Sequence, residues 1–276
     1  MKKRLLFMDL DGTLLNDEKK ITEGNRTALN ALLERGHGAI ITTGRPLKSA
    51  MDQARLLGMD RPGCYLIAYN GAVIYDWAQE KQIFTRSLPY SAVNRVVELA
   101  NERGEHIQTY DTWKVLVEKR CDDAAVRRYC RLIGMEFSVI EDVHTDLKEE
   151  PVKCLVINYE EKSGLLKVQE WIRANMAAEV DCFFSCDQYL EVVPKGMSKG
   201  EAVKMLSQMM NVAIADTVSV GDAANDLSMI EAAGIGVAMA NATPEVKAVA
   251  DYITMKDNNH DGIAELVERF FSQNVE

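Results

Sequence analysis

Short apolar runs alternate with amphipathic stretches in the first part of the chain. Leu5–Met8, Gly38–Thr43 and Tyr65–Tyr69 are continuous apolar runs, which are typical of strands buried on both faces. Ile21–Arg35 carries a helical stripe, and a second helix is expected from Pro46 to Leu57. This alternation predicts right-handed βαβ units built around a parallel sheet.

The pattern changes from about Phe84 to Val192, where the expected strands alternate between apolar and polar residues. These strands are His106–Tyr110, Lys114–Lys119, Val152–Tyr159, Asp181–Phe184 and Gln188–Val193. The helices expected between them are Ala92–Glu102 and Gly164–Ala174. Alternating strands of this kind indicate an α+β unit with an antiparallel sheet.

The βα rhythm resumes at Lys199. The helices expected there are Gly200–Met210, Asp226–Ala233, Val246–Ala250 and Gly262–Phe271, and the strands are Thr217–Val220, Ile235–Met239 and Tyr252–Thr254. The sequence therefore predicts an α/β protein with a discontinuous core domain, residues 1–83 and 193–276. An α+β domain, residues 84–192, is inserted into it.

Composition and charge narrow the classes of partner. The chain has 276 residues, 47% of them hydrophobic, and a formal net charge of -10, which argues against nucleic acid or an anionic membrane as the main partner. A small anionic substrate stays open, because a bound cation can reverse the field at one site. No apolar run approaches the roughly 18 residues of a membrane span, and the first one stops at Asp9, too early for a signal peptide. We therefore expect a cytoplasmic protein.

The cysteines give little sign of a metal site. The six residues are Cys64, Cys121, Cys130, Cys154, Cys182 and Cys186, and no CxxC pair occurs among them. Without that spacing a zinc site is not indicated. We expect buried free thiols in a reducing compartment.

Two carboxylates follow the first expected strand. Asp9 and Asp11 are two residues apart, so an extended backbone would point both off the carboxyl end of that strand. Neighbouring carboxylates repel unless a cation or a shared proton neutralises them, and oxygen ligands suit a hard ion such as Mg²⁺. The alternative is an ordinary Asp-Gly turn capped by a threonine.

Further polar groups stand at the ends of other expected elements. Thr43-Gly44-Arg45 follows the second strand, and Lys199 opens the helix that leads to Thr217–Val220. Alone, Thr43-Gly44-Arg45 could be a common strand-to-helix turn, and Lys199 could be a solvated surface lysine. Open parallel sheets, however, bind ligands beyond the carboxyl ends of their strands, where such groups would meet.

The stretch GDAAND adds Asp222, Asn225 and Asp226 after the strand Thr217–Val220. Alone, it could be a cap and an acidic first turn that complement a helix dipole. Taken together, the four places are expected to supply carboxylates, a hydroxyl beside backbone N–H groups, and an ammonium. That set is what a phosphoryl-transfer site needs.

Six stretches carry a resemblance to a known family. They are FMDLDGTLL, ITTGRP, YNGA, YLEVVPKGMSKG, GDAANDLSMIEAAGIGVAMANA and NNHDGI, and they span nearly the whole chain. In this order they resemble the haloacid dehalogenase superfamily of phosphohydrolases, in its Cof-type branch with a class IIB cap. Within that branch the chain is most similar to the YidA-type sugar phosphatases.

The resemblance implies roles for the acidic residues. Asp9 would be the nucleophile that forms an aspartyl-phosphate, and it would also ligate Mg²⁺. Asp11 would be the general acid and base, with its backbone carbonyl on the metal. Asp222 would be a direct metal ligand, and Asp226 would hold the outer shell of the metal.

The resemblance also implies how the phosphoryl group is held. Thr43 would bind its oxygens together with the Gly44 amide, and Lys199 would neutralise charge between the nucleophile and the phosphate. The further residues expected to contact the substrate are Leu10, Gly12, Arg45, Asn225 and Asn258.

The function implied is a Mg²⁺-dependent phosphomonoesterase of small phosphorylated metabolites, sugar phosphates above all. It would act as a monomer or weak homodimer, with the inserted domain as a cap over the site. An Asp at position 11, rather than Lys or Ser, favours hydrolysis or mutase chemistry. A phosphomutase of the same architecture is one alternative. A non-catalytic protein that binds phosphorylated metabolites is another, although the complete set of site residues argues against it.

Overall fold

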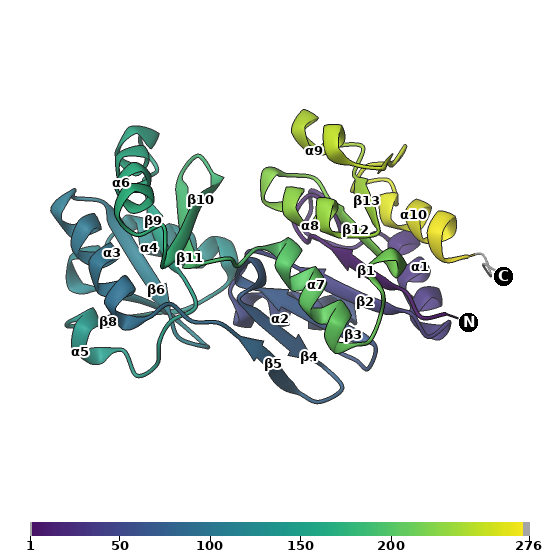
Figure 1. Cartoon of the computed structure of the whole chain (residues 1–276), viewed down its shortest axis with the longest axis horizontal. Helices are drawn as coiled ribbons and strands as arrows, with labels where there is room; N and C mark the ends of the chain where they lie inside the picture. The colour runs from purple at the N-terminus through teal and green to yellow at the C-terminus, as the bar shows by residue number, and fades with distance from the viewer. Residues whose placement is uncertain (1, 273–276) are drawn as a thin grey trace. The chain divides into compact units, whose positions relative to one another are not determined.

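The structure is a computed structural model that describes residues 2–272. The chain forms two compact units (Figure 1). The first comprises Met1–Gly44, Ala50–Phe84 and Ser198–Glu276, and the second comprises Arg45–Ser49 and Thr85–Met197. The chain passes from the first unit to the second between Phe84 and Thr85 and returns between Met197 and Ser198, close to the two places where the sequence pattern changes.

The first unit is built on a sheet that has, within residues 2–272, eight strands in the order β14-β13-β12-β1-β2-β3-β4-β5. Their bounds are β1 (Leu5–Met8), β2 (Gly38–Thr42), β3 (Cys64–Ala68), β4 (Val73–Asp76), β5 (Lys81–Thr85), β12 (Thr217–Gly221), β13 (Ile235–Ala238) and β14 (Tyr252–Ile253). β1 pairs in parallel with both β2 and β12, whereas β4 runs antiparallel to β3. The predicted parallel sheet is confirmed. The pattern did not predict β4 and β5, which are short and close the edge of the sheet.

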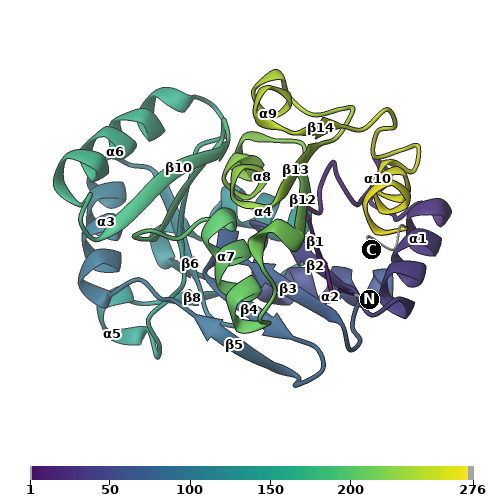
Figure 2. The ribbon, with the colours of Figure 1, turned by 45° about the vertical axis from the view of Figure 1, so that its right-hand side comes forward.

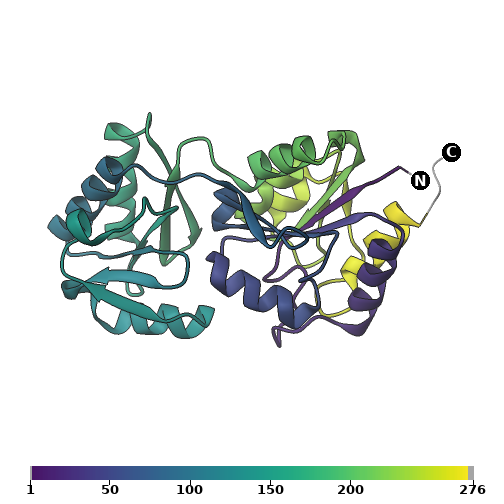
Figure 3. The same cartoon turned by 90° about the horizontal axis from the view of Figure 1, so that it is seen from below.

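Helices cover both faces of this sheet (Figure 3). They are α1 (Glu23–Glu34), α2 (Leu47–Leu57), α7 (Lys199–Met209), α8 (Leu227–Ala232), α9 (Pro244–Val249) and α10 (Gly262–Phe271). α1 packs against α10. α7 packs against α8, and Figure 2 shows these two helices together on one face of the sheet. Because both faces are covered, every residue of β1 and β2 is buried, which accounts for their continuous apolar sequence.

The second unit has, among the described residues, a sheet of six strands in the order β10-β11-β9-β6-β7-β8. They are β6 (His106–Tyr110), β7 (Val115–Glu118), β8 (Phe137–Ile140), β9 (Cys154–Ile157), β10 (Val180–Cys186) and β11 (Tyr189–Pro194). The helices are α3 (Tyr90–Glu102), α4 (Ala124–Ile133), α5 (Val143–Asp146) and α6 (Lys162–Asn175). The predicted α+β unit with an antiparallel sheet is confirmed, although β7 and β8 pair in parallel.

The pattern did not single out α4 and β8. A signal for α4 was present, because Asp123 accepts hydrogen bonds from the amides of Ala125 and Val126 at its start and Gly134 ends it in a left-handed conformation.

Of the described cysteines, all are free thiols, and Cys186 alone is exposed while the others are buried as expected. In the part of the chain from residue 2 to 272, none of the helices combines the length and apolar character that crossing a membrane requires.

Candidate active site

The site lies where the strand order of the first sheet reverses. From β1 the chain proceeds to β2 on one side, while β12 pairs with β1 on the other. The amide of Asp9, directly after β1, donates to the carbonyl of Val220 at 3.0 Å, which places Asp9 beside the residue that follows β12, Asp222. Ligands of open α/β sheets bind at such a switch point, beyond the carboxyl ends of the strands.

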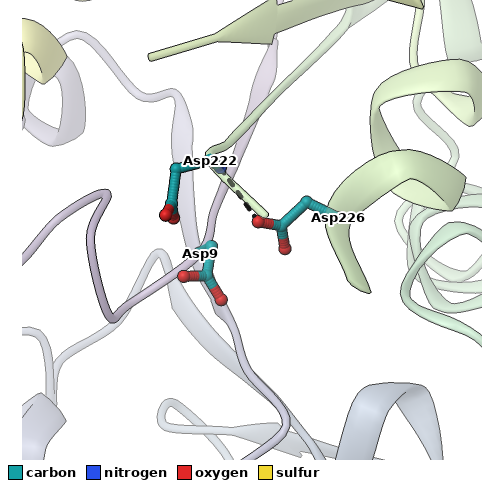
Figure 4. Close-up of side chains that lie close together, drawn as sticks. All are labelled: Asp9, Asp222 and Asp226. Carbon is teal, nitrogen blue, oxygen red and sulfur yellow. Dashed lines mark hydrogen bonds between the residues drawn. The ribbon is translucent and has the colours of Figure 1, made fainter. Parts of the chain in front are cut away.

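Three carboxylates meet there. One ligand atom from each of Asp9, Asp222 and Asp226 lies within 4.8 Å of the others (Figure 4). Asp9 is 6% exposed and Asp226 is fully buried. Buried carboxylates this close together require positive charge or protons nearby.

Lys199 supplies one positive charge. It is 1% exposed, and its Nζ lies 2.5 Å from Oδ1 of Asp9 and 2.5 Å from Oδ1 of Asp226. It is the first residue of α7, whose N-cap, Ser198, accepts a hydrogen bond from the amide of Glu201. Lys199 is therefore an internal ion-pair partner and not a solvated surface lysine.

Both carboxylate oxygens of Asp226 are engaged. Oδ1 accepts from Lys199, and Oδ2 accepts from the backbone amides of Asp222 at 3.0 Å and Ala223 at 3.1 Å. Figure 4 shows the bond to the Asp222 amide as a dashed line. Asp226 thus fixes both the ammonium group and the loop that carries Asp222.

The turn after β1 packs directly on Asp222. The hydroxyl of Thr13 donates to Oδ1 of Asp222 at 2.9 Å. Gly12 has φ +83°, and a Cβ added there would lie 2.6 Å from Oδ2 of Asp222. Glycine is needed at position 12 for both its backbone conformation and its lack of a side chain.

The pKa values of the site reflect burial and crowding. Burial, followed by the charge of Asp226, raises the pKa of Asp9 well above its ordinary value, although Lys199 opposes this. Burial also raises the pKa of Asp222 to about 6. Burial alone would lower the pKa of Lys199, but the carboxylates of Asp226 and Asp9 outweigh it and the pKa is raised. Lys199 is therefore charged at neutral pH.

The donor set suits a hard divalent cation. Three carboxylates surround one ammonium, so ionisation of all three leaves an excess of negative charge at the site. Burial is the main cause of the raised pKa values of Asp9 and Asp222, and the charge of neighbouring carboxylates raises them further. All the acidic ligands are oxygens, and these residues could hold a metal ion.

Comparison with known proteins identifies the family. The sequence profile of the haloacid dehalogenase-like hydrolases matches residues 6–267. The chain belongs to the haloacid dehalogenase-like hydrolase family. Its predicted resemblance to that superfamily is confirmed.

Relatives of this hydrolase align with it over most of their length. It is 31% identical to a protein from Serratia proteamaculans named HMP-PP phosphatase, over 89% of this chain and 87% of the relative. A solved structure of a haloacid dehalogenase-like hydrolase from Bacteroides thetaiotaomicron is 33% identical, with a TM-score of 0.88, covering 97% of this chain and 99% of the other. The HAD subclass IIB sugar phosphatase BT4131 has the same fold, with a TM-score of 0.82, 24% identity, and 97% and 99% of the two chains covered.

Two further predicted site residues, Thr43 and Asp11, lie outside the carboxylate cluster of the described residues. Thr43 is 2% exposed, and its amide donates to the carbonyl of Ile67 at 2.8 Å. Among residues 2–272, the carboxylate cluster does not include Asp11. Oδ1 of Asp11 accepts a hydrogen bond from Nζ of Lys19 at 2.9 Å. Their roles toward a substrate stay predictions.

Asn258 holds a neighbouring loop. It is 3% exposed, and its Nδ2 donates to the carbonyl of Leu15 at 3.1 Å and to Oδ1 of Asp17 at 3.2 Å. Leu10 is fully buried and its carbonyl accepts from the Leu15 amide at 2.8 Å. These bonds shape the loop that follows Asp11, and a contact of Asn258 with the substrate stays a prediction.

Asn225 and Arg45 are half-buried. Asn225 lies in a short 3₁₀ helix, Ala224–Asp226, directly beside the clustered Asp226. Arg45 groups with the second unit. Their contacts with a phosphoryl group stay predictions.

Sequence reasoning missed two residues that the structure brings to the site. Thr13 orients Asp222, and its signal was its place in the run DGT. Asn241 donates through Nδ2 to the carbonyl of Gly12 at 2.8 Å, and its Oδ1 accepts from the amide of Asn258. Asn241 lies inside one of the stretches that carry the family resemblance, but the pattern did not single it out, because these contacts join segments that are distant in the sequence.

Proposed function

We propose that this hydrolase is a Mg²⁺-dependent phosphomonoesterase of small phosphorylated metabolites, sugar phosphates above all, with Asp9 as nucleophile. The observation that carries the proposal is the buried contact of Lys199 with Asp9 beside Asp222. A buried lysine held on a carboxylate can neutralise charge as a dianionic phosphate approaches it. The relative from Serratia proteamaculans, named a phosphatase, supports the same chemistry.

Asp9 and Asp222 would hold the metal, and Asp226 would orient them through Lys199 and the loop amides. A bound Mg²⁺ ion would offset the charge of the phosphoryl oxygens and favour the ionised form of Asp9. Because both oxygens of Asp226 accept other hydrogen bonds, we assign it to the outer shell of the metal.

Two displacements would follow. A carboxylate oxygen of Asp9 attacks phosphorus, the ester P–O bond breaks, and Asp11 gives its proton to the leaving oxygen. Asp11 then takes a proton from water, the water oxygen attacks phosphorus, and the bond to Asp9 breaks. The ion pair of Asp11 with Lys19 is exposed and therefore weak, so Asp11 can exchange it for the substrate.

We propose that Thr43 and the Gly44 amide bind the phosphoryl oxygens. To the second unit we assign selection of the part of the substrate beyond its phosphate. Closure of such a cap excludes bulk water from a phosphoenzyme.

The test is phosphate release from a panel of small phosphate esters, with and without Mg²⁺, for the unaltered protein and Asp9→Asn. Release that needs Mg²⁺ and is lost in the variant supports the proposal. A requirement for a bisphosphate activator, with transfer and no release, would indicate a phosphomutase. Binding of esters that persists in Asp9→Asn, with no turnover by the unaltered protein, would indicate a binding protein.

A further inference from the structure

Asn70 is buried, but the polar atoms of its side chain make no hydrogen bond within the described residues. The residue is 2% exposed, and among the residues that the structure describes, neither its Oδ1 nor its Nδ2 has a hydrogen-bond partner. A buried polar group that loses its hydrogen bonds to water, and gains none, opposes folding. Such a group in a native protein therefore calls for a use outside the fold.

The backbone at Asn70 is also unusual. Tyr69 and Asn70 have φ values of 52° and 55°, and Gly71 follows with φ 110°. Successive left-handed residues other than glycine are rare, and backbone strain of this kind gathers at functional sites. Asparagine tolerates the conformation better than most residues, so the strain alone does not explain why the side chain is unpaired.

The turn Tyr69–Gly71 contacts two parts of the proposed site, the Thr43-Gly44 turn and the start of α7. On one side, a Cβ added to Gly44 would lie 2.9 Å from Oδ1 and 3.2 Å from Nδ2 of Asn70. The amide of Asn70 also donates to the carbonyl of Thr43 at 3.1 Å. The carboxamide therefore lies against the Thr43-Gly44 turn.

On the other side the turn meets the start of α7. A Cβ added to Gly71 would lie 2.4 Å from the carbonyl oxygen of Ser198, the residue before Lys199. Gly71 has no room for a side chain there, so the turn contacts the backbone of Ser198 directly. Asn70 thus stands between the proposed phosphate cradle and the helix that carries Lys199.

We propose that the Asn70 carboxamide is a further substrate-binding group, with Nδ2–H donating to a phosphoryl oxygen held by Thr43 and Gly44. This inference rests on the proposed function, since it needs a phosphoryl group on that turn. A donor that is already desolvated and fixed in place loses little on binding, and hydrogen bonds to charged groups are the strong ones.

The test uses inorganic phosphate as the probe, titrated calorimetrically into the protein with Mg²⁺ present, together with thermal unfolding. Asn70→Gly removes the carboxamide and keeps a residue that accepts positive φ. The matched control is Asn211→Gly, because Asn211 has φ 54° but is exposed at the end of α7. Asn70→Asp is the second variant, which keeps the size and shape of the side chain while replacing the donor by a carboxylate oxygen.

We expect Asn70→Gly to weaken phosphate binding about tenfold or more, and Asn70→Asp to weaken it further. The Tm of Asn70→Gly should be no lower than that of Asn211→Gly, because an unpaired buried amide has been removed. Phosphate binding within twofold of the unaltered protein, or a Tm well below that of Asn211→Gly, would overturn the inference and indicate a purely structural turn. If the unaltered protein binds no phosphate, the proposed function fails with it.

Discussion

The Nζ of Lys199 lies 2.5 Å from Oδ1 of Asp226, and neither side chain is exposed to solvent. Lys199 begins α7 and Asp226 precedes α8, so this pair ties the two helices together at the carboxyl end of β12. The same ammonium contacts Asp9 at 2.5 Å. One buried cation therefore sets the position of both the proposed nucleophile and the residue that shapes the proposed metal loop.

Replacing Lys199 by an uncharged residue should lower the free energy of unfolding of the protein. Lys199→Met leaves Asp9 and Asp226 buried without their partner, and breaking a buried pair in this way costs roughly 3–5 kcal/mol of stability. Urea unfolding of the metal-free protein measures this loss. The control is Lys204→Met on the same helix, whose exposed ion pair with Glu201 should contribute at most about 1 kcal/mol. Equal losses for the two variants would mean that the buried contacts of Lys199 are unimportant.

Gly12→Ala should damage metal binding beyond its effect on the backbone. Gly12 and Gly36 have nearly the same φ, +83° and +82°, but a Cβ meets Asp222 at position 12 and nothing within 4 Å at position 36. Both variants should lose about 1–2 kcal/mol from left-handed strain. Only Gly12→Ala should also need more Mg²⁺ for half-maximal phosphate release. A similar Mg²⁺ requirement in Gly36→Ala would show that strain, and not contact with Asp222, is responsible.

The raised pKa of Asp222 predicts a pH-dependent stability without metal. Burial raises the pKa of Asp222 from 3.8 to about 6, so between these values the folded protein binds more protons than the unfolded one. The stabilising contribution is present below about pH 4 and is lost as pH rises through about 6. Asp222→Asn cannot ionise, so with a chelator present its stability relative to the unaltered protein should rise by the order of 2 kcal/mol between pH 4 and pH 8. Urea unfolding at both pH values gives this difference, and one that does not change with pH would refute the prediction.

Periodicity predicted most of the fold for a physical reason. Strands such as β1 are covered on both faces, so burial leaves a continuous apolar run that can be read directly. β5 has no buried residue, so burial imposed no pattern on it, and the pattern missed it. α4 was missed although its cap at Asp123 was visible in the sequence.

The site could be predicted only in part. Asp9, Asp222 and Lys199 stand at element ends that the pattern located, so their meeting follows from the topology of a parallel sheet. The unpaired carboxamide of Asn70 could not be predicted in this way. It depends on the side-chain packing of a left-handed turn, which leaves no periodic trace in the sequence.

The proposed reaction depends on a covalent role for Asp9, and trapping the phosphoenzyme tests that role. Acyl phosphates, unlike free carboxylates, are reduced by borohydride to alcohols. The protein is therefore mixed with Mg²⁺ and a phosphate ester that it turns over, quenched with borohydride during turnover, digested and sequenced by mass spectrometry. We expect homoserine at position 9 when the ester is present and unmodified Asp9 when the ester is omitted. Unmodified Asp9 under these conditions, or reduction at Asp11 or Asp222 instead, would contradict it.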